Sequence, residues 1–519
     1  MNKLWRFPGG LHLPGHKDES TAVSVAAAQL PRFLVLPLQQ HIGEPAKALV
    51  KVGDHILKGQ MIAKASGYVS APVHASSSGT VVEIGERPIP HPSGLHALCI
   101  VIETDGQDTW LPHHPVEDYR QLDPSALRNI IREAGIVGLG GAGFPTYIKL
   151  NRGADKVIDT LILNGAECEP YITCDDMLMR ERPEEIIAGL FIMRHALQAR
   201  ACIIGIEDNK PHAIDALARV IHDLKVKDIR VAPIPTRYPA GGEKQLIKVL
   251  TGREVPSNGL PLHIGVVCQN VATATAVYRA ITYGEPLISR YVTVSGPGIQ
   301  QPRNLEVLLG TPIRELIEQC GGAPDDSGTF LMGGPMMGFP LHNLAAPVIK
   351  TTNCILAQPP AAPAQPVLPC IRCGVCAEAC PVSLLPQQLY WHAAAKDFTK
   401  AQSYNLFDCI ECGCCTSVCP SNIQLVDYYR FAKTEIAAQE LEKRKADTAR
   451  NRHEFRLQRL ERDKAERAAR HEQKKASLSD PATSAKNDAK PDVIQAAIER
   501  VQAKRAASDE SSGSVPAQH

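Results

Sequence analysis

The 519-residue sequence contains no run of about 18 consecutive apolar residues, the length that a membrane-spanning helix requires. We therefore expect no direct membrane span. The first 15 residues, which include Trp5, Pro8 and Gly9, lack the apolar stretch of a signal peptide, so we expect the chain to stay in the cytoplasm. There is also no excess of charge, because 56 basic side chains stand against 55 acidic ones. This balance argues against a dedicated nucleic-acid-binding protein, so we expect no nucleic-acid partner.

What the sequence does contain is an uneven distribution of cysteine. Its 44% hydrophobic and 21% charged residues are ordinary for a soluble protein with sizeable cores, and its length suggests three or four domains. Nine of the 16 cysteines, however, lie between Cys370 and Cys419. In a reducing compartment such a cluster indicates metal ligation rather than disulfides.

After an N-terminal segment, residues 1–30, short apolar runs separated by Gly, Pro and Ser predict a β-rich domain over residues 31–110. The runs are Phe33–Leu38, Met61–Ala63, Val69–Val73, Thr80–Ile84 and Ala97–Ile102. The stretch Val50–Ile84 resembles the biotinyl/lipoyl type of barrel-sandwich hybrid, which carries its cofactor on a lysine at a hairpin tip. Here the tip is Ser66-Gly67-Tyr68 and Lys64 is displaced from it, so we expect the module without that cofactor.

The rest of the chain divides by pattern, so we expect a multidomain α/β and β fold. Residues 115–265 alternate helix-like and strand-like segments, which favours an α/β domain with a largely parallel sheet. Residues 266–350 return to short strands and resemble a soluble-ligand-binding β-grasp module. We expect a Pro/Ala linker over 351–369, the cysteine-rich domain over 370–430, a charged helix over 431–478 and a disordered tail over 479–519.

Two cysteine runs fit the pattern C-x2-C-x2-C-x3-C-P at every position, 39 residues apart. The pattern is typical of a bacterial ferredoxin domain with two [4Fe–4S] clusters, in which the fourth cysteine of each run ligates the other cluster. The predicted metal ligands are therefore Cys370, Cys373, Cys376 and Cys419 for one cluster, and Cys409, Cys412, Cys415 and Cys380 for the other. Structural zinc would explain neither the third cysteine of each triplet nor the following proline. Cys414 is off the pattern and is interpreted as a packing residue or a minor outer-shell group.

A glycine-rich loop with Gly138, Gly140, Gly141 and Gly143 follows a helical segment and precedes Lys149. Such a loop lets the backbone approach phosphate oxygens closely, although taken alone it is at least as often only a tight turn. An apolar run then ends in Asn164-Gly165-Ala166-Glu167-Cys168-Glu169-Pro170, at the kind of strand end where α/β sheets bind ligands. Glu243 and Asn270 follow in two further polar strings, and any single carboxylate among them is more often a solvated loop charge.

Taken together, the strings GLGGAGFPT, NGAECEP, GGEKQL and QNVATA resemble the flavin- and NADH-binding subunit of respiratory complex I in order and spacing. With the barrel-sandwich start, the β-grasp module and the tandem ferredoxin motif, residues 1–430 resemble the C subunits of the Rnf (Rsx) ion-translocating electron-transport complexes. The resemblance implies noncovalent FMN at Gly138, Gly140, Gly141, Gly143, Lys149, Asn164 and Asn270. It also implies that Glu167, Glu169 and Glu243 lie near the flavin edge or the NADH ribose.

The sequence departs from the complex I pattern at three points. Ala166 stands where an acidic residue is usual, no aromatic-plus-lysine nucleotide clamp is evident around Arg253–Pro261, and the cysteines suit two clusters instead of one. The nucleotide contacts are therefore less firmly implied than the phosphate loop.

The implied function is that of a peripheral subunit on the cytoplasmic side of a bacterial inner membrane, part of a translocase. NADH would reduce FMN, and electrons would pass through two [4Fe–4S] clusters to an iron–sulfur partner subunit, while membrane-embedded partner subunits translocate the ion. No residue is assigned a catalytic role. A soluble NADH:ferredoxin-type oxidoreductase and a scaffold with an inert FMN fold remain alternatives.

Overall fold

The computed structural model describes residues 4–153, 156–323, 328–359, 366–478 and 495–503. The chain divides into two compact units, Met1–Lys433 and Thr434–His519. Among the helices described, we find none with the length and apolar character needed to cross a membrane.

The first unit contains a four-stranded parallel sheet in the order β11-β10-β9-β12. Its strands are β9 (Thr160–Gly165), β10 (Ala201–Glu207), β11 (Ile229–Ile234) and β12 (Val266–Asn270). The chain moves from β9 outward to β10 and β11 and then returns to the other side of β9. This reversal creates a switch point between β9 and β12, where parallel α/β sheets bind ligands at the carboxyl ends of the strands.

The parallel sheet confirms the expectation of an α/β domain, but the domain does not end where we expected. Because β12 pairs with β9 in register from Val266↔Thr160 to Asn270↔Asn164, the sheet extends past residue 265. The helices around it are α2 (Pro124–Glu133), α3 (Thr146–Lys149), α4 (Cys174–Glu181), α5 (Pro183–Leu197), α6 (Pro211–Asp223), α7 (Glu243–Thr251) and α8 (Val271–Thr282). Helices α5 and α8 pack closely, since a Cβ on Gly189 of α5 would overlap the backbone of Ala274.

The β-rich region consists of two small antiparallel sheets, β2-β8-β7-β4 and β3-β5-β6. Their strands are β2 (Phe33–Pro37), β3 (Lys47–Ala48), β4 (His55–Ile56), β5 (Met61–Lys64), β6 (Val73–His74), β7 (Gly79–Pro88) and β8 (His96–Thr104). Of the run expected at Val69–Val73, only Val73 is in a strand. The backbone carbonyl of Tyr68, at the hairpin tip, instead accepts a hydrogen bond from the Tyr147 hydroxyl.

A third, six-stranded mixed sheet has the order β1-β14-β13-β17-β15-β16. Its strands are β1 (Ala26–Ala27), β13 (Ser289–Ser295), β14 (Arg303–Leu308), β15 (Phe330–Met332), β16 (Phe339–Pro340) and β17 (Cys354–Ala357). The N-terminal segment, with helix α1 (Asp18–Thr21), is thus part of this sheet through β1, and helix α9 (Ile313–Gln319) follows β14. The linker expected over 351–369 is shorter than predicted because β17 pairs with β13; residues 360–365 lie outside the described residues.

The cysteine-rich part of the first unit contains short helices, two of which include the third cysteine of a triplet and two of which connect the triplets. They are α10 (Val375–Glu378), α11 (Pro386–Ala394), α12 (Phe398–Ser403) and α13 (Cys414–Ser417). A 3₁₀ turn at Leu406–Asp408 precedes Cys409, and two more lie earlier in the described part of the unit, at Tyr119–Gln121 and Pro261–Ile264.

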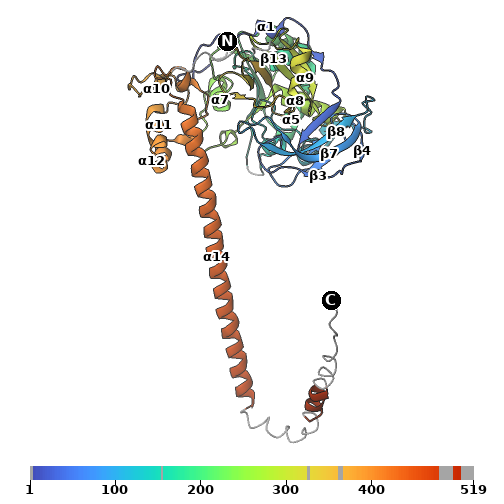
Figure 1. Cartoon of the computed structure of the whole chain (residues 1–519), viewed down its shortest axis with the longest axis vertical. Coiled ribbons are helices and arrows are strands. Elements are labelled where there is room, and N and C mark those ends of the chain that lie inside the picture. The colour runs from blue at the N-terminus through green and yellow to red at the C-terminus, as the bar shows by residue number, and fades with distance from the viewer. Residues whose placement is uncertain (1–3, 154–155, 324–327, 360–365, 479–494, 504–519) are drawn as a thin grey trace, which may run out of the picture. The chain divides into compact units, whose positions relative to one another are not determined.

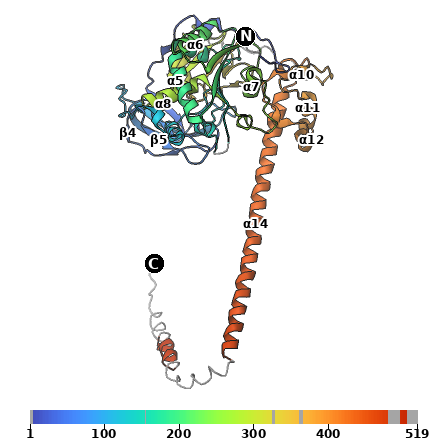
Figure 2. The ribbon, with the colours of Figure 1, turned by 180° about the vertical axis from the view of Figure 1, so that it is seen from behind.

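The last long element is α14, which spans Leu425–Leu478 without a break in either view (Figures 1 and 2). It begins six residues before the helix expected from residue 431. In the second unit its side chains between residues 437 and 477 are almost all exposed. Of the predicted disordered tail, residues 495–503 are helical, and 479–494 and 504–519 lie outside the described residues.

Candidate flavin edge and cysteine cavities

Asn164 and Asn270 lie side by side at the switch point, because β9 and β12 pair in register at these two residues. Asn270 is the N-cap of α8, and its side-chain oxygen accepts hydrogen bonds from the backbone N–H groups of Ala272 and Thr273. Asn164 donates to the carbonyl oxygen of Gly241 at 2.8 Å and accepts from Ala166. Both predicted residues thus shape the backbone at this edge, which we call the flavin edge.

The glycine loop lies against the same edge. The backbone N–H of Leu139 donates to the Thr273 hydroxyl in the first turn of α8, and a Cβ on Gly140 would lie 3.4 Å from the Cβ of Asn270. Gly141 has a φ of +106° and open space where a Cβ would be. Within the described residues, the N–H groups of Gly140, Gly141 and Ala142 have no hydrogen-bond acceptor, and all three residues are exposed.

The loop is therefore shaped as an anion site, since exposed backbone N–H groups beside a helix N-terminus attract phosphate. Gly138 and Gly143 close it through the hydrogen bond from Gly143 N–H to the Gly138 carbonyl. The sequence analysis did not single out Arg290. Its side chain donates a hydrogen bond to the Leu139 carbonyl at 3.1 Å and so fixes the position of the loop. It is only 5% exposed, so this contact is part of the core.

Lys149 and Glu243 form an ion pair of 2.6 Å at the edge, between the end of α3 and the start of α7. Lys149 also donates to the carbonyl of Cys268 in β12. Burial lowers the pKa of Lys149, but the charge of Glu243, the neighbouring Cys268 and the hydrogen bond to Glu243 together outweigh it, and the pKa lies above its ordinary value. The ammonium group is therefore charged at the carboxyl end of the sheet.

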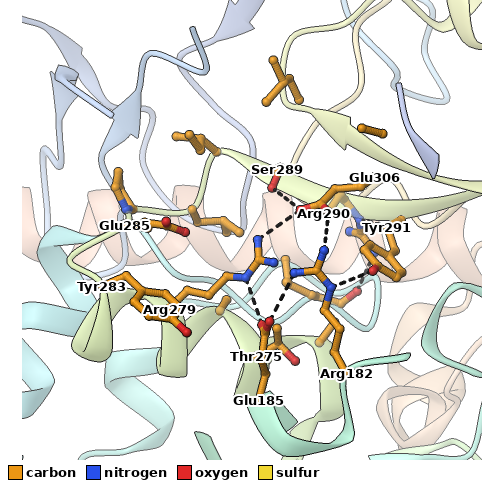
Figure 3. A pocket seen from close by; sticks show the side chains of 18 of the residues that line it. Arg182, Glu185, Thr275, Arg279, Tyr283, Glu285, Ser289, Arg290, Tyr291 and Glu306 are labelled. Carbon is orange, nitrogen blue, oxygen red and sulfur yellow. Dashed lines mark hydrogen bonds and ion pairs between the residues drawn. The ribbon is translucent and has the colours of Figure 1, made fainter. Parts of the chain in front are cut away.

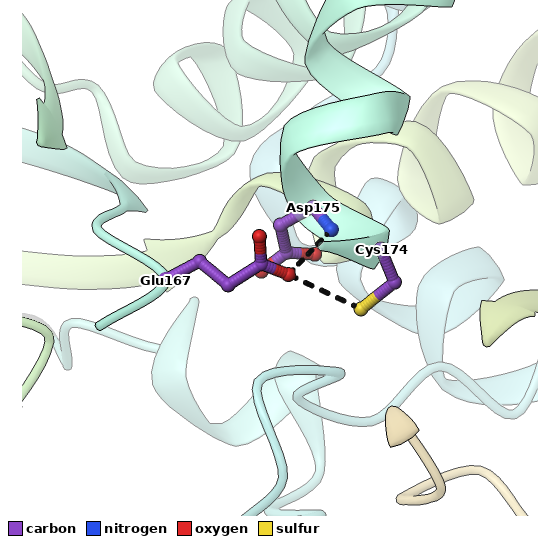
Figure 4. Close-up of side chains that lie close together, drawn as sticks. All are labelled: Glu167, Cys174 and Asp175. Carbon is purple, nitrogen blue, oxygen red and sulfur yellow. Dashed lines mark hydrogen bonds between the residues drawn. The ribbon is translucent and has the colours of Figure 1, made fainter. Parts of the chain in front are cut away.

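Glu167 points to the N-terminus of α4, beside Cys174 and Asp175 (Figure 4). Its carboxylate accepts hydrogen bonds from the backbone N–H groups of Asp175, at 2.8 Å, and of Asp176. Asp175 in turn accepts from the side-chain amide of Asn270 at 2.6 Å. Burial, and secondly the charge of Glu167, raise the pKa of Asp175 to about 7. The Glu167 carboxylate thus fixes the N-terminus of α4, and the Asp175 carboxylate fixes the side chain of Asn270.

The partly buried Lys17 and the buried Lys210, which the sequence analysis did not single out, stabilise the same strand end. Lys17 donates to the carbonyls of Glu167 and Glu169 at 2.8 and 2.7 Å, although burial lowers its pKa. Lys210 pairs with Glu207 at 2.7 Å and reaches the Glu167 carbonyl at 3.3 Å. Lys17 and Lys210 are far from Glu167 in sequence, so no local sequence pattern predicts these contacts.

The side chain of Glu169 contacts the turn between β15 and β16. Its two carboxylate oxygens accept the backbone N–H groups of Met336 and Met337, at 3.1 and 2.8 Å. Burial raises the pKa of Glu169 to about 7. The carboxylate implied for the nucleotide site is therefore engaged by the protein itself.

The eight patterned cysteines line two cavities, four in each. One cavity is lined by Cys370, Cys373, Cys376 and Cys419, which we call the outer set. The other is lined by Cys380, Cys409, Cys412 and Cys415, which we call the inner set. Four thiols around one space suit a [4Fe–4S] cluster, and the assignment of a cluster to each set stays a prediction. Cys414 is fully buried and lines neither cavity.

A cavity of about 570 Å³ lies among the three sheet-containing parts and borders the glycine loop through Leu139 and Arg290 (Figure 3). Its charged wall is a closed ring in which Glu185 and Glu306 each pair with both Arg182 and Arg279, at 2.7–3.2 Å. None of the predicted site residues lines it. The two arginines and two glutamates of the ring thus neutralise one another.

Four family models match the chain along its length. They are the RnfC barrel sandwich hybrid domain over residues 5–107, the Nuo51 FMN-binding domain over 131–279, the SLBB domain over 291–340 and the 4Fe-4S dicluster domain over 369–423. The first and second matches extend beyond the boundaries expected at residues 31 and 265. The fold and sites thus define a multidomain redox protein whose cofactors are FMN and 4Fe–4S clusters.

Comparison with curated relatives identifies the family within this class of redox proteins. The chain is 52% identical to the C subunit of the ion-translocating oxidoreductase complex of Pseudomonas aeruginosa, over 90% of this chain and 60% of that one. It is 48% identical to the protein of the same name from Yersinia pestis, over 92% of this chain and 77% of that one. The chain belongs to the family of ion-translocating oxidoreductase complex C subunits.

The chain spans about 60% of the length of the Pseudomonas aeruginosa relative. Among solved structures, an NAD⁺-reducing [NiFe]-hydrogenase in the air-oxidized state matches 54% of each chain, at 22% identity and a TM-score of 0.42. That likeness is too low to support any statement about this chain.

Proposed function

We propose that this chain is a peripheral electron-transfer subunit of an ion-translocating oxidoreductase, on the cytoplasmic side of the bacterial inner membrane. NADH is oxidised at the flavin edge, and electrons leave one at a time to an iron–sulfur partner subunit. Membrane-embedded partner subunits translocate the ion. The observation that carries the proposal is that one compact unit contains both the flavin edge and eight thiols in two groups of four.

The residues at the flavin edge suit FMN, which accepts two electrons from a nicotinamide and releases them singly. The free N–H groups of Gly140 and Gly141 bind the phosphate, while Gly138 and Gly143 hold the loop in shape. The open space beside Gly141 supports this role, because a phosphate oxygen there meets no side chain. The N-terminus of α8 adds a favourable dipole.

The polar residues of the edge position this site. Lys149 supplies a positive charge near the flavin, and Glu243 orients it through their ion pair. Asn164 and Asn270 hold the backbone that faces the flavin ring, and Glu167 fixes the N-terminus of α4. The contacts of Glu169 favour a structural role over one at the NADH ribose.

The outer and inner sets each hold one [4Fe–4S] cluster, in the crossed assignment predicted from the two cysteine runs. The cavities support this grouping, since each contains three thiols of one run and the fourth of the other. A [4Fe–4S] cluster would carry single electrons, which suits a chain that receives electrons in pairs and passes them on singly.

Co-purification tests this function. The full chain is expressed anaerobically together with the proposed partner subunits, and the membranes are then separated from the soluble fraction. We expect one FMN and about eight irons per chain, bleaching of the flavin by NADH, and recovery with membrane-embedded subunits. Full cofactor content without any membrane partner would indicate the soluble oxidoreductase instead, and clusters without flavin would indicate the scaffold.

A further inference from the structure

Lys350, between β16 and β17, is a buried cation without an anionic partner. The residue is only 1% exposed, and its ammonium group donates to the backbone carbonyls of Pro72 and Gly135, each at 2.7 Å. Among the described residues, no carboxylate is paired with it, whereas the buried Lys210 pairs with Glu207 at 2.7 Å. Because burying an unpaired charge is costly, the position of this lysine requires an explanation.

The backbone around Lys350 contacts the glycine loop at two points. The Lys350 carbonyl accepts a hydrogen bond from Arg290, and another nitrogen of the same guanidinium group donates to the Leu139 carbonyl at 3.1 Å. On the next residue, the methyl group of Thr351 lies 2.6 Å from where a Cβ of Gly143 would be. The buried ammonium group is therefore directly adjacent to the loop that is shaped as an anion site.

The titratable groups that face Lys350 are two histidines of the β-rich region. A Cβ on Gly135 would lie 2.9 Å from the Lys350 Nζ and 3.3 Å from the His74 Nδ1, which has no hydrogen-bond partner. Burial, and secondly the charge of Lys350, lower the pKa of His41 to about 4 and that of His74 to about 3. Both imidazoles are therefore neutral near pH 7, and neither provides a counter-charge.

Arg290 is a second buried cation at the same place. Its side chain donates to backbone carbonyls, including those of Leu139 and Lys350. The titratable groups that face it are Cys174 and Asp175. Burial raises the pKa of the Cys174 thiol well above its ordinary value and that of Asp175 to about 7, so at or below neutral pH they give Arg290 only part of a counter-charge. The region beside the glycine loop thus has an excess of positive charge.

We propose that Lys350 supplies the counter-charge for the FMN phosphate from within the protein, and that Arg290 connects this charge to the glycine loop. The inference rests on the proposed function, which has the phosphate bound at the loop. Backbone N–H groups hold the phosphate oxygens, and the buried ammonium group balances their charge without touching them. Its attraction is strong because buried charges are screened less than exposed ones. The charge of Lys149, by contrast, is already paired with Glu243.

The charge of Lys350 couples flavin binding to a proton. Burial lowers the pKa of Lys350 to about 7, and a nearby phosphate dianion raises it again because it favours the charged form. Above pH 7 the flavin-free chain therefore takes up a proton as it binds FMN, and its affinity for FMN falls as pH rises. The phosphate supplies no proton there, since its second pKa is about 6. Riboflavin, which has the same ring without the phosphate, takes up none.

Titration calorimetry of the full, deflavinated chain measures this proton directly. FMN and riboflavin are each titrated at about pH 8 in two buffers that differ in ionisation enthalpy. We expect roughly half a proton or more to be taken up per FMN and none per riboflavin. Binding of FMN without proton uptake would overturn the inference and leave the proposed function intact. Failure of the unchanged chain to bind FMN would refute the proposed function and the inference with it.

Variants assign the proton to Lys350. We expect Lys350→Gln to bind FMN about tenfold more weakly, the order expected for losing one unit charge within about 10 Å at an effective dielectric constant near 20. Its riboflavin affinity should stay unchanged and its proton uptake should vanish, whereas Lys350→Arg should keep the FMN affinity and lose its pH dependence. The matched control is Lys58→Gln, because the ammonium group of Lys58 is also largely buried but is paired with Asp108; it should bind FMN normally.

Two results with Lys350→Gln would overturn the inference. Equal weakening of FMN and riboflavin binding would show that Lys350 only joins the parts that meet there. Proton uptake that persists in this variant would assign the proton to another group, such as Asp175. If the variant does not fold, the proton uptake of the unchanged chain and the pH profile of Lys350→Arg still decide.

Discussion

The exposed glycine loop leads to a quantitative prediction for FMN affinity at Gly141. Its φ of +106° disfavours any side chain, so Gly141→Ala strains the backbone whether or not a phosphate binds there. The strain costs about 1–2 kcal/mol. A matched control is Gly106→Ala, because Gly106 has a φ of +72° and equally open space for a Cβ, in a loop of the β-rich region.

The two variants should differ in flavin binding. A Cβ at residue 141 occupies the space that a phosphate oxygen needs and removes one charge-assisted hydrogen bond, worth about 1.5–3 kcal/mol. We therefore expect FMN to bind about 10- to 150-fold more weakly to Gly141→Ala. Gly106→Ala should bind it as the unchanged chain does.

Flavin fluorescence during titration of the deflavinated protein measures this affinity, and thermal unfolding without flavin measures the strain in both variants. Equal flavin affinity in the two variants, with equal loss of stability, would mean that the loop is only a turn. The comparison separates binding from folding because both substitutions place the same side chain in the same region of backbone conformation.

Four further changes test other parts of the chain. Lys149→Met should weaken FMN binding about tenfold by removing a positive charge, whereas loss of stability with unchanged affinity would assign the ion pair with Glu243 to folding alone. Between about pH 4 and 7 an unfolded Asp175, with its ordinary pKa of 3.8, loses its proton while the folded one keeps it. Stability should therefore fall as pH rises through this window, and denaturant unfolding of Asp175→Asn should show a shallower fall; an identical slope would contradict the raised pKa. Cys414→Ser should leave the spectra of both clusters unchanged. Truncation after residue 435 should leave the flavin and iron content unchanged, and loss of flavin or iron would show that the tail packs on the core.

The grouping of the eight patterned cysteines around two cavities was predictable because its information is local. Each triplet wraps one loop, and the spacing alone groups residues such as Cys370 and Cys376. Even the pairing of Cys380 with the second run, across 29 residues, follows from the repeat of one pattern. The parallel sheet was predictable for the same reason, since β-branched runs alternate with helical ones.

Non-local pairing explains what the sequence did not predict. Strand β12 looks like the start of a new β-rich region, and only its hydrogen bonds to β9 make it part of the parallel sheet. Strand β1 joins a sheet formed almost 300 residues later. Strand periodicity identifies a strand but not the strand with which it pairs. The domain boundaries at β1 and β12 therefore differ from those expected.

The placement of Glu169 shows how this limit affects function. Its position in the string NGAECEP suggests a nucleotide contact, because neighbours in sequence tend to share a site. Glu167 and Glu169, however, follow the end of strand β9, and their side chains contact different elements although they are only two residues apart. Glu167 accepts a hydrogen bond at the N-terminus of α4, and Glu169 accepts one from the turn between β15 and β16. A turn some 165 residues away supplies the N–H groups that Glu169 binds, so its surroundings follow from the fold and not from the motif.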